Sequence, residues 1–333
     1  MKVRITERMW NELCVELLKN TELETSGILL GESINTQNGA IITIRHAAVV
    51  PDDAYLIRKV DQISIDAVAL NRITKPARNN GWSIFTIHTH PMAIDAWFSR
   101  ADDIGDSRLM PSFHCQVPGV PHGSVVITNS GDVATRVFDK NAKSQDVCFQ
   151  IVGREISRKG IKVEKSEPWF ARQKLALGEE GQAKLRNLRV GIIGLGGIGS
   201  LISMQLAHLG IGEIVLVDGD IVEASNLPRI VGANKNDVGQ SYKVDVAARY
   251  IDHLGLLTNV ERYPEYLGVK HESLIASCDV VLSCVDTHSA RAILNRLSYK
   301  YYVPVIDLGT VFRVDELGAI VSDSGRVVTI GPG

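Results

Sequence analysis

The segment RVGIIGLGGIG, residues 189–199, decides the fold of the second half of the chain. Its first part, residues 189–194, is a short apolar run typical of a buried strand. The glycines that follow allow the backbone to approach a phosphate closely, and the N-terminus of the next helix favours an anion. The glycines that make this pattern are Gly194, Gly196 and Gly199.

A second strand-like run, EIVLVDGD at residues 213–220, follows this turn. Asp218 lies near its end, 19 residues after Gly199, where a carboxylate is placed to hydrogen-bond a ribose. These features alone suit NAD as well as ATP, and they would favour an NAD-dependent dehydrogenase. Further strands at 279–286 and 302–309 alternate with helical segments, which predicts a parallel, Rossmann-like sheet.

The first half of the chain has a different pattern, which predicts a separate compact α/β domain. A helix is expected from Thr6 to about Lys19, and a second over residues 60–74, ending before Pro76. The expected strands cover residues 26–33, 40–50 and 81–90, with a hairpin at 123–139. We therefore expect domains at 1–140 and 169–333, joined by a polar linker at 141–168.

Composition narrows the possible functions. The chain has 333 residues, with 36 Lys and Arg against 38 Asp and Glu, for a formal charge of −2. This balance argues against nucleic-acid or membrane-surface binding by charge. No secretory signal and no apolar run of about 18 residues is present, so no membrane span is expected. The five cysteines form no Cys-x-x-Cys pair, which favours reduced thiols in the cytoplasm.

The sequence His88-Thr89-His90 closes the predicted strand at 81–90. Side chains two apart on a strand point to one face, so both imidazoles can bind one cation. Asp102 is a possible third ligand, and two His with one carboxylate leave a zinc position open, as in catalytic sites. Glu24 is the candidate general base, with Glu22 as a competitor. Read more simply, Ser99 and Asp102 form a helix capping box, which is compatible with a metal role.

Taken together, the segments ETSGILLG (24–31), HTHP (88–91) and SRAD (99–102) resemble the JAMM, or JAB/MPN-type, metallopeptidase family. The resemblance implies an α/β/α domain that binds Zn²⁺ and cleaves after the C-terminal Gly of ubiquitin-like proteins. Eight residues separate His90 from Ser99, where the family usually has seven, and Asp95 and Asp103 are alternative ligands. The roles implied are zinc binding by His88, His90 and Asp102, acid–base catalysis by Glu24, and oxyanion stabilisation by Ser99.

The second half resembles the ubiquitin-activating-enzyme-like superfamily of the ThiF/MoeB type. The resemblance lies in DGDIVEASNLPR (218–229), KVDVAA (243–248) and SCVDTHSAR (283–291), with a lead-in helix near 171–182. It implies adenylation of the C-terminus of a ubiquitin-like or sulfur-carrier protein with ATP and Mg²⁺. The implied cofactor-binding residues are Gly194, Gly196, Gly199, Asp218, Asp220, Asn226, Arg229, Lys243 and Asp286, with Asp286 on Mg²⁺ and Arg172 reaching a neighbouring subunit's nucleotide.

The favoured hypothesis is therefore a bifunctional cytoplasmic enzyme of a ubiquitin-like pathway, forming a homodimer through its C-terminal domain. A dehydrogenase with an accessory domain, and a scaffold in which both sites are inactive, are the alternatives. Relatives continue past the point where this chain stops at Gly333, so a truncated ThiF-type domain is expected.

Overall fold

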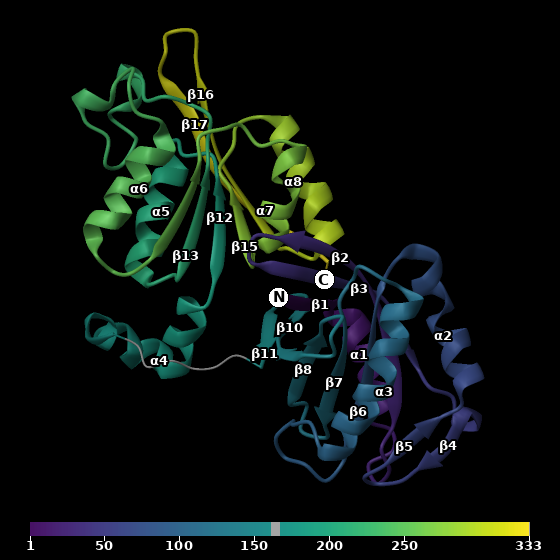
Figure 1. The fold of residues 1–333 in the computed structure, drawn as a ribbon. Coiled ribbons are helices and arrows are strands. Elements are labelled where there is room, and N and C mark those ends of the chain that lie inside the picture. The colour runs from purple at the N-terminus through teal and green to yellow at the C-terminus, as the bar shows by residue number, and fades with distance from the viewer. Residues whose placement is uncertain (161–166, 333) are drawn as a thin grey trace. The chain divides into compact units, whose positions relative to one another are not determined.

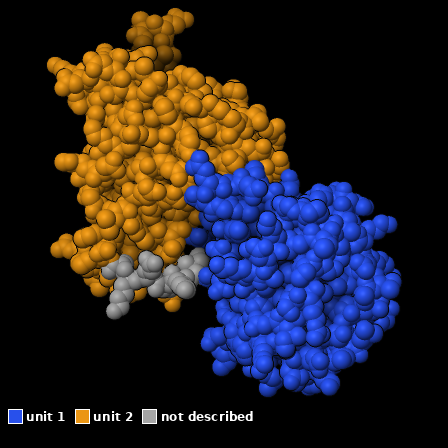
Figure 2. All heavy atoms as spheres, viewed as in Figure 1, with its two compact units in different colours: residues 1–161, 333 blue, residues 162–332 orange. Residues whose placement is uncertain are grey.

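The computed structural model describes residues 1–160 and 167–332. The chain divides into two compact units, residues 1–161 and 162–332, which Figure 2 colours separately and which are described here one at a time. Residues 161–166 of the expected linker, and Gly333, lie outside the described residues. Within the described ranges, no helix has the length and apolar character needed to cross a membrane.

The first unit is built on a nine-stranded sheet in the order β11-β10-β1-β3-β2-β6-β7-β8-β9 (Figure 1). β6 lies inside the sheet, pairing antiparallel with β2 and parallel with β7. A separate two-stranded sheet joins β4 and β5. The strands are β1 (Lys2–Thr6), β2 (Ser26–Thr36), β3 (Gly39–Val49), β4 (Tyr55–Arg58), β5 (Ile63–Ile65), β6 (Ser83–His90), β7 (His122–Thr128), β8 (Val133–Phe138), β9 (Ser144–Asp146), β10 (Cys148–Val152) and β11 (Ile156–Lys159).

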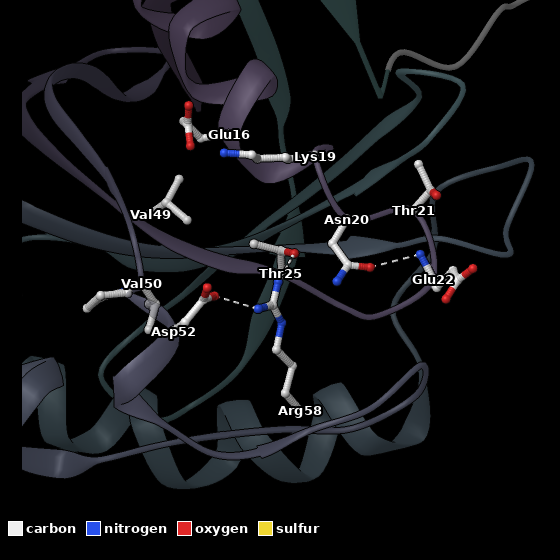
Figure 3. Close-up of a pocket in the computed structure, with 11 residues that line it drawn as sticks. Glu16, Lys19, Asn20, Thr21, Glu22, Thr25, Val49, Val50, Asp52 and Arg58 are labelled. Carbon is white, nitrogen blue, oxygen red and sulfur yellow. Dashed lines mark hydrogen bonds and ion pairs between the residues drawn. The ribbon is translucent and has the colours of Figure 1, made fainter.

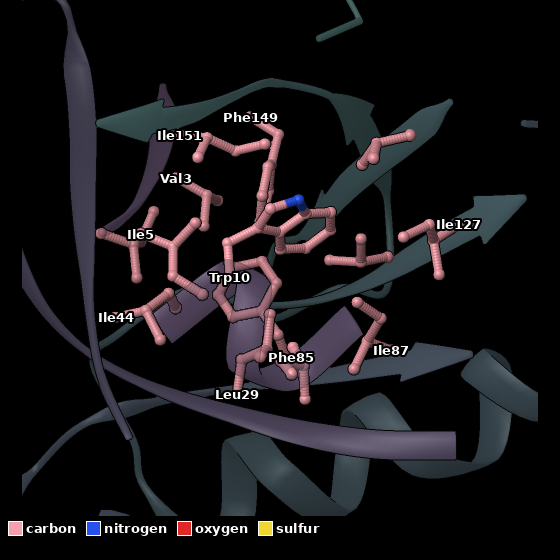
Figure 4. Packing of buried hydrophobic residues seen from close by; sticks show 14 of the residues in the cluster. Val3, Ile5, Trp10, Leu29, Ile44, Phe85, Ile87, Ile127, Phe149 and Ile151 are labelled. Carbon is pink, nitrogen blue, oxygen red and sulfur yellow. The ribbon is translucent and has the colours of Figure 1, made fainter. Parts of the chain in front are cut away.

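Helices cover both faces of this sheet, so the α/β/α expectation is confirmed. α1 (Glu7–Leu17) buries Trp10 against one face, where the ring of Trp10 lies 5.1 Å from that of Phe149 (Figure 4). α2 (Ala67–Asn80) and α3 (Arg100–Gln116) pack on the other face, in a cluster that includes Phe113 of α3. Alternate strand residues serve the two clusters because successive side chains point to opposite faces.

α2 begins and ends later than the expected helix at 60–74. Residues 63–65 pair in β5, and α2 starts after Asp66, whose side chain accepts a hydrogen bond from the Ala69 N–H at 2.9 Å. The helix then continues through Pro76, because Ala77 beyond it is fully buried against the sheet. The proline removes one backbone donor, and packing past it outweighs that loss.

The segment expected to be a linker also differs from its prediction. Residues 144–159 supply β9, β10 and β11, and the whole of β10 pairs with β1 in parallel register. Phe149 is fully buried, while β9 is exposed along its length. The short, mainly apolar segment CFQIV at 148–152 forms β10. It was not predicted as a strand because polar stretches lie on both sides of it.

The second unit has a six-stranded sheet in the order β14-β13-β12-β15-β16-β17, parallel except for β17, so the Rossmann-like prediction is confirmed. Strand order reverses at β12, since β13 and β14 lie on one side of it and β15 and β16 on the other. A crevice at the carboxyl ends of β12 and β15 is the usual ligand site of such sheets. The strands are β12 (Arg189–Ile193), β13 (Glu213–Val217), β14 (Asn259–Tyr263), β15 (Val280–Ser283), β16 (Val305–Val314) and β17 (Ile320–Ile330).

The helices of this unit lie on either side of its sheet. α5 and α6 pack on one face, and α7 and α8 lie on the opposite side (Figure 1). α4 is interrupted at Gly178, where φ is 72° and ψ 168°. The helices are α4 (Ala171–Arg186), α5 (Gly197–Leu209), α6 (Lys243–Leu254), α7 (Glu272–Ser277) and α8 (His288–Tyr301).

Candidate metal centre and nucleotide site

Two histidines of β6 and one aspartate of α3 meet in the first unit. His88 and His90 bring their Nε2 atoms to 3.2 Å from each other. Asp102 Oδ1 lies 2.9 Å from His88 Nε2, and Oδ2 lies 3.4 Å from His90 Nε2. These three residues form a group whose candidate ligand atoms all lie within 4.8 Å of one another.

The cap of α3 brings Asp102 to this position. Ser99 is the N-cap, and its Oγ accepts from the Asp102 N–H at 3.2 Å while Asp102 Oδ2 accepts from the Ser99 N–H at 2.6 Å. The capping box is therefore present, and it leaves Asp102 close enough to both histidines to be a candidate ligand. Burial alone would raise the pKa of Asp102, but hydrogen bonds from His88 and His90 outweigh it and leave the pKa well below its ordinary value.

The longer spacing between His90 and Ser99 is absorbed by a loop that is tied to the β7–β8 turn. Ala96 N–H donates to Asp132, and the Asn129 amide donates to the carbonyl of Pro91. Of the alternative ligands, Asp103 instead pairs with Arg136 at 2.6 Å, and Asp95 is exposed. The loop also places Trp97 edge-on to His90, with ring centroids 5.8 Å apart.

Glu24 lies beside the histidines because its segment extends the pairing of β2 with β6. Thr25 N–H donates to Thr89 Oγ1 at 2.8 Å, and Thr89 N–H donates to the Thr25 carbonyl at 3.0 Å. This pairing brings Glu24 Oε1 to 3.8 Å from His90 Nε2. Burial raises the pKa of Glu24 to about 7, and the nearby His88 and His90 oppose that rise. Glu22, the competitor, is exposed.

Arg58 of β4, which the sequence analysis missed, holds the same segment from outside. Its Nε donates to the Glu24 carbonyl at 2.9 Å, and its two Nη groups donate to Thr25 Oγ1 and Asp52 Oδ1. Figure 3 shows this arginine reaching Thr25 at the side of a pocket of about 660 Å³. Arg58 and Glu24 are far apart in the sequence and meet only in the folded chain. No local motif could therefore have predicted their contact.

The donor set fits a divalent transition metal such as Zn²⁺. Two imidazole nitrogens and one carboxylate are typical zinc ligands of catalytic sites. The three side chains are only 10–13% exposed, so a cation would be largely shielded from solvent. Ser99 Oγ accepts the cap bond from the Asp102 N–H, which leaves its hydroxyl hydrogen able to donate to another acceptor.

The glycine turn of the second unit has close backbone packing. Gly194 has a φ of 89°, and a Cβ there would lie 2.7 Å from the Cys284 carbonyl oxygen. A Cβ on Gly199 would lie 1.9 Å from the Gly194 carbonyl oxygen, so the start of α5 also requires glycine. Gly196 has open space where its Cβ would lie, and the Arg229 side chain passes beside Gly197. The turn is therefore closely packed at Gly194 and Gly199 and has open space beside Gly196.

Asp218 contacts this turn directly, and Asp220, close to Asp218 in the chain, forms an ion pair with Lys243. Asp218 accepts from the N–H groups of Leu195 and Asp220 at 2.6 and 2.8 Å, so it organises the turn at the position expected for ribose binding. Burial raises the pKa of Asp218. Lys243 Nζ lies 2.6 Å from Asp220 Oδ2, and the Tyr266 hydroxyl also donates to Asp220.

The remaining residues predicted to bind the nucleotide lie at different distances from the glycine turn along the fold, and some have no contact with it in the part of the chain that the structure describes. Asn226 is buried and accepts from the Glu223 N–H, whereas Arg229 donates to the Ser225 carbonyl. Asp286 is exposed, in the loop that follows Cys284 and so begins beside Gly194. Arg172 is exposed on α4 and takes part in none of these contacts within the described residues.

Asp307 is a buried carboxylate that the sequence analysis did not single out. It lies on β16 next to β15, accepting from Ser283 Oγ at 2.8 Å and from Arg291 Nε at 3.1 Å. Arg291 also donates to the Val285 carbonyl at 2.6 Å, so this network supports the loop that carries Asp286. The signal available was an acid inside the apolar run YVPVIDLG, residues 302–309.

Comparison with known families agrees with the two-unit division. Residues 6–140 match the family model described as prokaryotic homologs of the JAB domain, and residues 170–330 match the model of the ThiF family. Both matches lie within single units of the structure. The family resemblance of each half is therefore confirmed.

Individual relatives match a little under half of the chain. The adenylyltransferase and sulfurtransferase uba4 of Aspergillus clavatus is 34% identical over 167 residues, covering 46% of this chain and 34% of that protein. The SAMP-activating enzyme E1 of Haloferax volcanii is 32% identical over 157 residues, covering 47% of this chain and 54% of that protein. A crystal structure of E. coli MccB with MccA-N7isoASN is 28% identical, with a TM-score of 0.39 and 44% of each chain covered.

Proposed function

Because the chain joins a domain of the prokaryotic JAB family to a domain of the ThiF family, we propose that it is a bifunctional enzyme of a ubiquitin-like protein pathway. The first unit is a zinc-dependent peptidase that cleaves after the C-terminal Gly of a ubiquitin-like or sulfur-carrier protein. The second unit uses ATP and Mg²⁺ to adenylate that C-terminus. The chain spans only about a third to a half of the relatives named above, so this assignment is carried chiefly by the geometry of its own sites.

The observation that carries the peptidase proposal is the meeting of His88, His90 and Asp102 beside the buried Glu24. When bound there, Zn²⁺ supplies Lewis-acid chemistry that polarises a carbonyl and lowers the pKa of water. Glu24 is placed to accept a proton at this point and later to give it to the leaving amine. A pKa near 7 suits both transfers, since neither protonation state is then strongly favoured at neutral pH.

Ser99 and Trp97 complete the role of the first unit. Ser99 Oγ accepts the cap bond of α3, so its hydroxyl hydrogen is available to donate to the developing oxyanion. Trp97 is 56% exposed beside His90, so it offers an apolar surface to the residues that flank the scissile bond.

The adenylation proposal is supported by the charges around the glycine turn. Attack of a carboxylate on the ATP α-phosphate develops negative charge, which cations neutralise. Arg229 and Lys243 supply positive charge, and Asp286 holds Mg²⁺, an ion usually bound by one or two carboxylates together with phosphates. Lys243 pairs with Asp220 in the structure, so it shares its charge between Asp220 and the bound phosphates.

Several properties of the whole protein belong to this proposal. Arg172 is exposed, as required for it to reach the nucleotide of a second copy in a homodimer formed through the C-terminal unit. All five cysteines lie in the described part of the chain and none of them forms a disulfide, which supports the reducing cytoplasm as the location. Both units act on the C-terminus of the same carrier protein. Because they are tethered, a carrier bound to one unit is present at a higher effective concentration at the other.

The peptidase is tested with a β-grasp protein ending in Gly-Gly, taken from the same organism and extended by a short peptide. Cleavage after the second Gly should be abolished by a zinc chelator and restored by Zn²⁺. Glu24→Ala should abolish cleavage while zinc remains bound, and Glu22→Ala, its exposed neighbour, is the matched control. Cleavage that survives in Glu24→Ala would remove the peptidase half of the proposal.

The adenylation is tested by ATP–pyrophosphate exchange in the presence of the same carrier with a free C-terminus. Exchange should disappear in Asp286→Ala and remain in Asp315→Ala, an exposed acid in the β16–β17 turn. Tight NAD binding without ATP binding would favour the dehydrogenase instead. Failure of both reactions in a protein that binds neither zinc nor ATP would favour the scaffold.

A further inference from the structure

Two rows of side chains cross the sheet face beneath α3. In one row His88 of β6 pairs with Val126 of β7, and in the next Thr86 pairs with Ser124. Ser124 in turn pairs with Arg136 of β8. Paired residues on neighbouring strands point to the same face, and so do residues two apart along a strand. Ser124 and Arg136 therefore share a face with the candidate metal ligand His88, one row away from it.

Arg136 uses its whole guanidinium on α3 and the residues that precede it. Nη2 and Nε donate to Asp106 Oδ2 at 2.6 and 3.0 Å, and Nη1 donates to Asp103 Oδ1 at 2.6 Å. Ser124 Oγ donates to the same oxygen of Asp106 at 2.6 Å. The guanidinium also lies over the ring of Phe98, 4.0 Å from its centroid.

These contacts fall on both sides of Asp102 in the sequence. Phe98 precedes the helix cap, Asp103 is the next residue after Asp102, and Asp106 is one turn later. A rotation of α3 about its axis, or a shift along it, would disturb the contacts of Arg136 with Asp103 and Asp106 and would move Asp102 with them.

Stability alone is a weak reason for such a cluster. Arg136 is 7% exposed and Asp106 5%, and buried ion pairs are often no more stabilising than apolar side chains of similar volume. What the planar guanidinium adds is a fixed geometry among several partners. We propose that Arg136 is a positioning residue of the metal centre, which holds the first turn of α3 so that Asp102 reaches the ion bound by His88 and His90. This inference rests on the proposed zinc site.

The experiment measures metal binding by the full-length chain, with no peptidase substrate. Zinc affinity is obtained by competition with a chromophoric chelator, and the ligand geometry is read from the visible absorption of the Co²⁺-substituted protein. Arg136→Lys keeps the charge buried beside Asp106 but cannot hold both carboxylates in one plane. Partners beyond the direct ligands typically contribute tenfold or more to metal affinity, so we expect about a tenfold weaker zinc Kd with weaker, shifted cobalt bands.

Two further variants separate positioning from general loss of stability. Asp103→Asn removes one contact at a side chain that is 60% exposed, so it should fold normally and still weaken zinc binding. Arg4→Lys is the matched control, because Arg4 is also buried but lies on β1 and donates to Gln150. Its zinc Kd and cobalt spectrum should match the wild type. A loss in Arg4→Lys equal to that in Arg136→Lys would overturn the inference.

The outcomes distinguish the inference from the proposal on which it depends. Zinc uptake by the wild type, with unchanged Kd and cobalt spectrum in both Arg136→Lys and Asp103→Asn, would overturn the positioning role alone. A wild type that binds no zinc would overturn the proposed metal site and the positioning role together.

Discussion

His122 should make the stability of the first unit depend on pH in a way that can be calculated. The imidazole is fully buried at the start of β7, where Nδ1 accepts from the Ile84 N–H at 3.0 Å and Nε2 lies 2.9 Å from the Val117 carbonyl. Only the neutral ring can accept at Nδ1 while donating at Nε2. Burial lowers the pKa of His122 to about 4, from an ordinary value near 6.5.

The sign follows from the two protonation equilibria. Above pH 6.5 the ring is neutral in both states, so His122 costs nothing. Between pH 6.5 and 4 the unfolded chain binds a proton that the folded chain does not, and the free energy of unfolding falls by about 1.4 kcal/mol per pH unit. Below pH 4 the folded state also binds the proton, and the total loss levels off at about 3 kcal/mol.

The assay is chemical denaturation of wild type and His122→Asn at pH 7, 6, 5 and 4, followed by tryptophan fluorescence. Three of the four tryptophans, Trp10, Trp82 and Trp97, lie in the first unit. The stability advantage of wild type over His122→Asn should shrink by about 3 kcal/mol from pH 7 to pH 4, while other titrating groups cancel in the difference. His46→Asn, at an exposed histidine, is the control. A difference that stays constant across this range would refute the reasoning.

Three further predictions concern the cores and the two sites. Trp10→Ala should lower the free energy of unfolding of the first unit by about 3–5 kcal/mol, because it removes the ring packed on Phe149. Denaturant titration measures this loss, and a loss under about 1 kcal/mol would contradict the packing. Gly194→Ala should weaken ATP binding measured by calorimetry without changing zinc uptake, because its Cβ would meet the Cys284 carbonyl oxygen; equal ATP affinity would contradict the described turn. Zinc at about 1,000 times its Kd should stabilise the first unit by about 4 kcal/mol. This is measured as a higher Tm that a chelator reverses. An unchanged Tm would argue against a zinc site present only in the folded state.

Local patterns in the sequence were sufficient to predict that His88, His90 and Asp102 lie together and that a glycine turn follows β12. His88 and His90 alternate on one strand, and Ser99 caps the helix that carries Asp102, so their relation depends on short-range geometry. The glycine turn is likewise local, since Gly194 and Gly199 lie within one strand–turn–helix unit. Such features are encoded within about ten residues, and periodicity or capping reveals them.

What the sequence could not reveal depends on contacts between distant segments. Arg58 reaches Glu24, Arg136 reaches α3, and Asp307 supports the loop of Asp286 only after the sheets have formed. The strands at 144–159 were hidden for the same reason, because β10 becomes a strand by pairing with β1 at the other end of the unit. From the sequence alone, charged residues such as Arg58, Arg136 and Asp307 are expected at the solvated surface. The fold largely buries their side chains.

The central claim is that His88, His90 and Asp102 together bind one zinc ion. The most direct measurement is the zinc content of the purified chain after reconstitution and removal of loosely bound metal. We expect one equivalent in the wild type and in Asp95→Ala, and well under half an equivalent in Asp102→Ala. A wild type that retains no zinc, or an Asp102→Ala variant that retains a full equivalent, would contradict it.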